Sequence, residues 1–225
     1  MTIKTLLIKF QNKISASEIP LFRGAVINSL DEKLVLFHNH VNDKLRYAYP
    51  LIQYKRIDGR AAIMCIGEGA DTVWEFFQSA NFNIHLGERR IKLQLGDLLH
   101  QDYNIAVDDK RYYAYSITEW LPLNQDNYEQ YIHLDDLGRQ VAMLNRILTG
   151  NILSMCKGLG IYLDQKVETV ITSLSPPKEV RFKNVPVISF DVTFHTNTYL
   201  PDNIGIGKHV SVGFGTIKNQ NEKQL

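Results

Sequence analysis

The sequence predicts an α+β fold made of two tandem ferredoxin-like (βαββαβ) lobes. Apolar stretches with strand spacing and with helix spacing alternate along the chain, the first hundred residues show the order βαββαβ, and a similar order begins again past Leu99. The 225 residues suffice for one large domain or two small ones. We therefore predict an N-terminal lobe over residues 1–99 and a C-terminal lobe over residues 100–225.

The elements of the first lobe follow from local patterns. Residues 3–10 are apolar between polar ends, which predicts the first strand. Ser15-Ala-Ser-Glu18 is a capping box, and the apolar residues after it keep spacings of three and four, which predicts a helix from about residue 18 into the 30s. The other elements predicted here are strands over 45–54 and 61–66 joined by a turn at 57–59, a helix over 71–78 with Trp74, Phe76 and Phe77 in the core, and one or two strands within 82–95.

The second lobe is predicted in the same way. The alternation over 112–121 indicates a strand, and apolar residues at helical spacing over 134–156 indicate a long helix that stops before the glycines at 158 and 160. The other elements predicted here are strands over 167–174, 180–182, 185–194 and 210–217, a break at Pro176-Pro177 and a polar tail over 219–225. Because the halves share no visible sequence identity, the duplication rests on element order alone.

Composition excludes several classes of protein. A chain with 44% hydrophobic and 22% charged residues is too apolar to be disordered, and a net charge of +1 excludes a globally basic nucleic-acid coat. Residues 1–60 nevertheless hold ten basic and five acidic side chains, so a local basic face and an anionic partner are compatible with the sequence. No stretch approaches a membrane span, the N-terminus does not fit a signal peptide, and Cys65 and Cys156 are typical of buried thiols, so we expect a cytoplasmic protein.

A glycine-rich segment near the C-terminus is the first candidate site. Gly205 and Gly207 form one G-h-G pair, where h is apolar, and Gly213 and Gly215 form a second after five residues. Glycine permits positive φ and close backbone approach, and successive free N–H groups in such turns bind phosphate oxygens. Lys208 and His209 add donors beside them, which favours an anion-binding loop. The alternative is a hairpin that only turns a corner.

A histidine pair after the first helix is the second candidate site. His38 and His40 can act as base and acid near neutral pH, and Lys44, Arg46 and Tyr47 follow them with phosphate donors and a ring for stacking. One alternative, of about equal weight, is a helix cap plus a surface histidine. A metal site is a third reading, but the sequence shows no third ligand beyond nearby Asp43.

Together these motifs resemble the CRISPR-associated repeat-processing endoribonucleases of the "Cas six" family, most closely its b branch. The glycine segment over 205–215 matches the glycine-rich loop of the family, and His38-Asn-His40 matches the place of its catalytic histidine. The resemblance implies tandem ferredoxin-like lobes that cut the repeats of precursor CRISPR RNA without a metal cofactor. It implies catalysis by His38 and His40, helped by Tyr47, with RNA contact at the loop.

The resemblance also implies a reaction scheme. One imidazole would deprotonate a ribose 2′-OH, the other would protonate the leaving 5′-oxygen, and a 2′,3′-cyclic phosphate would result. Lys33, Lys44 or the loop N–H groups would stabilise the charge on the phosphorane. Expected partners are repeat RNA, other CRISPR complex subunits and a second copy of the chain.

Three other functions stay open at this point. A non-catalytic RNA-binding subunit would keep the loop without needing the histidines. A two-histidine phosphoesterase needs two His-x-Ser/Thr motifs, and only His209-Val-Ser211 fits. In a protein-interaction module the glycine loop would be merely structural.

Overall fold

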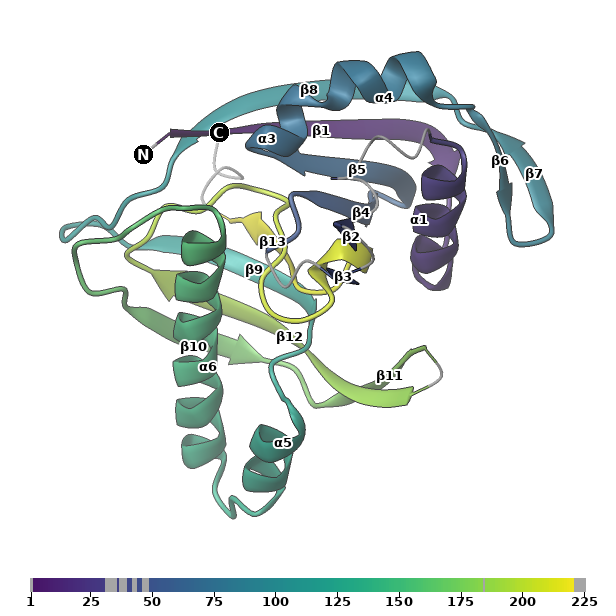
Figure 1. Ribbon diagram of the computed structural model, residues 1–225. Coiled ribbons are helices and arrows are strands. Elements are labelled where there is room, and N and C mark those ends of the chain that lie inside the picture. The colour runs from purple at the N-terminus through teal and green to yellow at the C-terminus, as the bar shows by residue number, and fades with distance from the viewer. Residues whose placement is uncertain are drawn as a thin grey trace. The chain divides into compact units, whose positions relative to one another are not determined.

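The computed structural model describes residues 2–30, 36, 40–41, 44–45, 49–183 and 185–220 (Figure 1). Contacts divide this part of the chain into two units. The N-terminal unit holds residues 2–104 and the short segment 211–213, and the C-terminal unit holds residues 105–210 and those from 214 onward. The boundary predicted after residue 99 falls inside a strand of the N-terminal unit, β8 (Leu95–Asn104).

The N-terminal unit has ferredoxin-like topology. Its four main strands are ordered β4-β5-β1-β8, and every neighbouring pair is antiparallel. Helix α1 lies between β1 and the β4–β5 hairpin, and the short helices α3 and α4 lie between β5 and β8. The elements are β1 (Thr2–Lys13), a 3₁₀ turn (Ala16–Glu18), α1 (Ile19–Asn28), β2 (His40–Val41), β3 (Lys44–Leu45), β4 (Ile52–Ile57), β5 (Arg60–Ile66), α3 (Glu68–Asp71), α4 (Val73–Ser79), β6 (Asn83–Leu86), β7 (Arg89–Lys92) and β8.

The predicted start of the first helix is confirmed, but α1 ends at Asn28 and does not continue into the 30s as predicted. The capping box forms, with the Ser15 backbone N–H donating to a Glu18 carboxylate oxygen at 2.8 Å, and the helix follows at once. Phe22 of α1 is fully buried and meets the rings of Phe10 and Tyr54 edge-on at 5.9 and 5.8 Å between centroids. The helix is thus fixed on the face of the sheet that these rings share.

Three expectations for this unit need correction. The strand predicted from residue 45 begins only at Ile52 within the described residues. Strand β8 was not predicted, because it is an outer strand of the sheet with nearly all its residues exposed and therefore lacks an apolar alternation. Trp74 was predicted to be core and is 71% exposed, whereas Phe76 on the same helix is buried.

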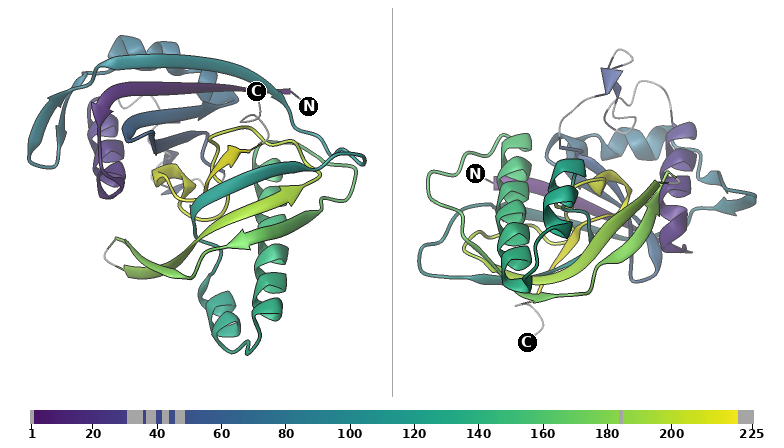
Figure 2. Two further views of the ribbon diagram at one scale, coloured as in Figure 1. Left: turned by 180° about the vertical axis from the view of Figure 1, so that it is seen from behind. Right: turned by 90° about the horizontal axis from the view of Figure 1, so that it is seen from below.

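The C-terminal unit repeats the strand order of the first. Its sheet is ordered β10-β12-β9-β13, with β11 pairing along β12. The long helix packs beside β10, as the views in Figures 1 and 2 agree. The elements are β9 (Tyr113–Trp120), α5 (Gln125–Ile132), α6 (Leu137–Gly158), β10 (Thr169–Leu174), β11 (Lys178–Phe182), β12 (Val185–Thr196), a 3₁₀ turn (Val210–Val212) and β13 (Thr216–Asn219).

In the second half one prediction was wrong and one helix was missed. The strand predicted over 210–217 is a 3₁₀ turn followed by a strand that starts only at Thr216, because Gly213 and Gly215 take positive φ between them and interrupt the extended backbone. Helix α5 was not predicted, since its sequence is mostly polar. The predicted tail continues into residues 221–225, which lie outside the described residues.

Counted along the chain, the four main strands of each unit lie in the spatial order second, third, first, fourth. This is the ferredoxin-like arrangement, so the predicted fold class is confirmed. Both cysteines are free and buried, as predicted. No helix in the described part of the chain is long and apolar enough to cross a membrane.

Candidate nucleic-acid interface

The two G-h-G pairs form the stem of a loop between β12 and β13. The Ile206 N–H donates to the Gly215 carbonyl at 2.8 Å, and Gly205 pairs with Thr216 as an isolated antiparallel bridge. One step further out, the Ile217 N–H donates to the Ile204 carbonyl at 2.9 Å. The glycine spacing seen in the sequence therefore places the two pairs opposite each other, and residues 207–214 form the tip.

Two of these glycines are required by the protein itself. Gly207 has φ of +97°, and a Cβ there would lie 2.8 Å from the Trp120 indole nitrogen, which donates to the Asn151 side chain at 3.0 Å. Gly215 has φ of +63°, and a Cβ there would overlap the carbonyl oxygen of Ile206. The close approach predicted for these glycines is thus an approach of the loop to its own unit.

The tip of the loop presents two cationic residues. Lys208 donates from its ammonium group to the Leu123 carbonyl at 3.0 Å, and burial lowers its pKa. His209 has φ of +55° and stacks on Phe182, with ring centroids 3.7 Å apart and 22° between the planes. Burial, with smaller contributions from Lys208 and Lys183, lowers the pKa of His209. The imidazole is therefore biased toward its neutral form, while the lysine remains the main charge of the tip.

The backbone at the tip offers hydrogen-bond donors. In the described part of the chain, the N–H groups of Gly207, Lys208 and His209 have no hydrogen-bond acceptor. These three residues are consecutive. Gly207 and His209 both have positive φ, so the backbone turns here and is not extended. Successive N–H groups in a turn can surround an anion oxygen. The tip is thus suited to a phosphate group.

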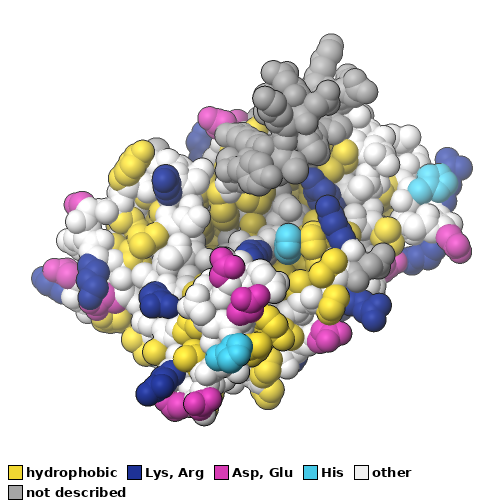
Figure 3. Space-filling view, turned by 60° about the horizontal axis from the view of Figure 1, so that its bottom comes forward, with side chains coloured by type: hydrophobic (Ala, Val, Ile, Leu, Met, Phe, Trp, Pro, Cys, Tyr) yellow, Lys and Arg dark blue, Asp and Glu magenta, His cyan; other side chains and the backbone are white. Residues whose placement is uncertain are grey.

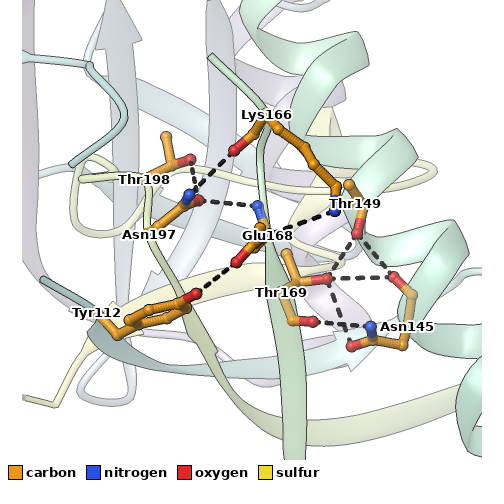
Figure 4. Close-up of polar contacts among 8 residues, drawn as sticks. All are labelled: Tyr112, Asn145, Thr149, Lys166, Glu168, Thr169, Asn197 and Thr198. Atoms are coloured by element: carbon orange, nitrogen blue, oxygen red, sulfur yellow. Dashed lines mark hydrogen bonds and ion pairs between the residues drawn. The ribbon is translucent and has the colours of Figure 1, made fainter. Parts of the chain in front are cut away.

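A polar cluster fixes α6, which carries Asn151, to the sheet beneath the loop. The Asn145 amide bonds to the backbone of the outer strand β10, donating to the Thr169 carbonyl at 2.8 Å and accepting from the Ile171 N–H at 3.0 Å. The Thr149 and Thr169 hydroxyls lie 2.6 Å apart. Figure 4 shows this cluster continuing through Tyr112, Lys166, Glu168, Asn197 and Thr198. Asn151, the partner of the Trp120 indole against which Gly207 fits, therefore lies on a helix that is anchored to the sheet.

The predicted catalytic segment is described only in part. The backbone of His40 pairs with Leu45, and that of Val41 with Lys44, in the two-residue strands β2 and β3. The pairing places His40 and Lys44 at opposite ends of one short hairpin of the N-terminal unit. The remaining predicted site residues of this segment, His38, Tyr47, Lys33 and Arg46, lie outside the described residues.

Charged side chains outside the loop are dispersed, and one of them is buried. On the face drawn in Figure 3, lysine and arginine side chains are spread among hydrophobic and acidic ones and form no single basic patch in the described part. Sequence reasoning missed Lys55 of β4, which is fully buried and whose pKa burial lowers to about 7. The sequence could not reveal this burial, because Lys55 occupies a polar position in an alternating strand, where an exposed lysine would also be expected.

Two tandem ferredoxin-like units, the second with a glycine-rich loop between its last two strands, define the class of fold to which this chain belongs. The sequence pattern of the Cas6b N-terminal domain matches residues 1–104, and that of the Cas6b C-terminal domain matches residues 107–220. The chain therefore belongs to the Cas6b family. The resemblance inferred from the glycine loop and the histidine pair is confirmed at this level.

Solved structures agree with the family match. A Cas6b crystal structure has a TM-score of 0.86 and 28% identity, covering 97% of this chain and 100% of the other. A CRISPR RNA processing endoribonuclease, also Cas6b, has a TM-score of 0.75 and 27% identity over the same shares. An uncharacterized protein of Methanocaldococcus jannaschii is 37% identical over 101 residues, which are 45% of this chain and 67% of that protein.

Proposed function

We propose that this protein is a metal-independent endoribonuclease that cleaves CRISPR precursor RNA within its repeats. The observation that carries the proposal is the likeness, over 97% of the chain, to a Cas6b structure described as a CRISPR RNA processing endoribonuclease. The match of both Cas6b domains to this one chain supports it further. No cofactor enters the proposal.

The proposed chemistry rests on the histidine segment. One of His38 and His40 takes the proton of a ribose 2′-OH, whose oxygen attacks the adjacent phosphorus. The other imidazole protonates the 5′-oxygen as its bond to phosphorus breaks, which leaves a 2′,3′-cyclic phosphate. Tyr47 assists, and Lys33 or Lys44 stabilises the negative charge of the phosphorane.

RNA binding is assigned mainly to the glycine loop. The N–H groups of Gly207, Lys208 and His209 are available for a phosphate, and Lys208 adds a positive charge. Gly205, Gly213 and Gly215 shape the stem and the tip, and Arg46 supplies a further cation from the other unit. Because these donors address phosphate oxygens and not bases, they position the RNA without reading its sequence.

Other partners are part of the proposal. A second copy of the chain and further subunits of a CRISPR complex are expected to associate with it. The alternative function is a non-catalytic RNA-binding subunit on the same fold, which predicts tight binding of repeat RNA without cleavage.

Incubation with labelled repeat RNA in EDTA tests the proposal. We expect cleavage at one position in each repeat, at a rate that added Mg²⁺ leaves unchanged. Loss of activity in EDTA with recovery in Mg²⁺ or Mn²⁺ contradicts metal independence. An RNA with one 2′-deoxynucleotide before the cut should bind and resist cleavage, because the nucleophile is missing. Normal cleavage of that RNA indicates that water is the nucleophile.

A further inference from the structure

A groove of about 440 Å³ lies beside the glycine loop in the C-terminal unit. One wall is the start of α5 with the residues before it, and the other is the stretch of β12 that extends beyond β9. Lys208 of the loop tip lines the groove as well. The groove is thus continuous with the place where we expect a phosphate, and its volume is that of a small-ligand site.

The α5 wall is held in a fixed shape. Asn124 caps the helix, its side-chain oxygen accepting from the Asn127 N–H at 2.7 Å, and Gln125 donates to the Glu129 carboxylate at 3.0 Å. Tyr128 lies one turn further and is 39% exposed, so part of its ring is open to the solvent. An exposed tyrosine ring beside a basic loop is suited to stacking on a nucleobase.

The β12 wall is apolar and has an open edge. Val185, Val187 and Ile188 line it, and Val185 is 58% exposed. Strand β11 pairs with one edge of this stretch, whereas β9 begins to pair only at Phe190. In the part of the chain that the structure describes, no strand covers its other edge. The wall therefore presents an apolar strand edge to the groove.

One acidic group in the groove determines what can bind there. Glu179 of β11 is exposed and lines the groove, and its carboxylate has no hydrogen bond or ion pair within the described residues. The neighbouring Lys178 instead pairs with Asp191, at 2.5 Å. A free carboxylate repels phosphate and accepts hydrogen bonds, so it is suited to the N–H groups on the edge of a base.

We propose that this groove binds a guanine base of the RNA, in addition to the phosphate site of the glycine loop. Guanine alone among the four bases carries two adjacent donors on its Watson–Crick edge, N1–H and the N2 amino group, which match the two oxygens of Glu179. Adenine would turn the lone pair of its N1 toward the carboxylate. The ring stacks on Tyr128, and Lys208 holds the adjoining phosphate.

This inference rests on the proposed RNA-binding function, and it adds sequence selectivity to it. The test is a set of repeat RNAs in which each guanosine in turn is replaced by inosine, which lacks the N2 amino group. Affinity is measured for the wild type, Glu179→Gln and a control, Glu129→Gln. The control loses the same charge on α5, does not line the groove, and keeps an amide oxygen that can still accept the Gln125 hydrogen bond of the α5 wall.

We expect one position at which inosine weakens wild-type binding roughly 10- to 100-fold, the effect of one hydrogen bond to a charged group. Glu179→Gln should largely abolish this difference, and Glu129→Gln should keep it. Tyr128→Ala should weaken binding of the unsubstituted RNA more than Tyr128→Phe, because phenylalanine retains the stacking ring.

Two outcomes overturn the inference. In the first, inosine weakens RNA binding at no particular position. In the second, inosine weakens binding at one position by the same factor in the wild type and in Glu179→Gln. If the wild type still binds and cuts repeat RNA in either case, the proposed function stands and only the guanine site is lost. A wild type that binds no repeat RNA contradicts both.

Discussion

The two units of this protein share one strand order and differ in their last connection. In the N-terminal unit the third and fourth main strands, β5 and β8, are connected by α3, α4 and the β6–β7 hairpin. In the C-terminal unit the corresponding strands, β12 and β13, are connected by the glycine-rich loop. A helix satisfies its interior N–H groups internally, whereas the loop leaves three consecutive ones without an acceptor in the described chain. The same fold can therefore leave backbone N–H groups free where a helix would pair them.

The comparison also suggests a division of labour. The proposed acid and base, His38 and His40, belong to the N-terminal unit, in the segment that comes after α1 in the sequence. The proposed phosphate and base contacts belong to the C-terminal unit, apart from the cation that Arg46 supplies. If this division is correct, substitutions of the histidines should change the rate of cleavage, and substitutions in the glycine loop and groove should change RNA affinity.

The largest expected effect is the loss of RNA cleavage when either histidine of the pair is replaced. His38→Ala and His40→Ala should each retain RNA affinity, while cleavage falls by about 10²-fold or more for the general acid or base. Because the two act together, the double variant should be only slightly slower than the poorer single one. Single-turnover cleavage and filter binding measure the two quantities separately.

Two results would contradict this division for the histidines. Both single variants could cut at the wild-type rate, which would place the catalytic groups elsewhere. The wild type could bind tightly without cutting, which would favour the binding-subunit function.

The next largest effect is expected on stability, when a glycine of one unit and a glycine of the other are each replaced by alanine. Gly215→Ala should cost about 2–4 kcal/mol of unfolding free energy, because its Cβ would overlap a backbone oxygen at positive φ. Gly24→Ala in α1 is the control, because a Cβ there meets nothing within 4 Å. It should stabilise the protein by up to about 1 kcal/mol. Urea denaturation measures both, and equal effects would show that the loop glycine has no special requirement.

The sequence predicted those parts of the fold in which local signals and packing agree. The capping box and α1, the turn at 57–59 and the long helix α6 were all visible. Asp58 and Gly59 both have positive φ at the predicted turn, and α6 carries a continuous buried stripe. In these elements the apolar residues of the sequence are the residues that are buried in the structure, so the sequence pattern was sufficient to predict them.

The misses share a physical cause. Strand β8 is exposed on both faces and α5 is mostly polar, so neither has the periodicity by which elements are detected. Val210 and Val212 are buried like strand residues, but they belong to a 3₁₀ turn whose position depends on the glycines after it. Trp74 has the spacing of a core residue and lies on the exposed side of α4.

The candidate site was predictable as residue types and not as geometry. The glycine spacing indicated a loop, but only the structure shows that Gly207 fits against Trp120 and that the two glycine pairs face each other. The stacking of His209 on Phe182 joins residues far apart in sequence, so no local pattern could indicate it. The groove that Glu179 lines could not be predicted for the same reason, because four separate segments form it.

A smaller effect is expected for the cation of the loop. Lys208→Ala should weaken binding of repeat RNA roughly 3- to 10-fold and reduce the slope of log K against log salt by about 0.7, the value for one phosphate contact on a single strand. Lys166→Ala, an exposed lysine of the same unit outside the loop, is the charge-matched control. Titrations at several salt concentrations give both quantities. Equal slopes for the two variants would remove Lys208 from the phosphate site.

The smallest effect concerns the pH dependence of the loop. Because the folded pKa of His209 is lowered, mainly by burial and further by Lys208 and Lys183, the unfolded chain takes up its proton first as the pH falls. The stability associated with the neutral imidazole is therefore complete above about pH 6.5, the unfolded pKa, and declines as the pH falls through the folded pKa. Thermal unfolding of wild type and His209→Gln between pH 7.5 and 5 should show a shallower decline in Tm for the variant. The difference should shrink at high salt, because salt screens the repulsion from the two lysines. Identical slopes at low salt would show that the imidazole is as free to protonate in the folded loop as in the unfolded chain.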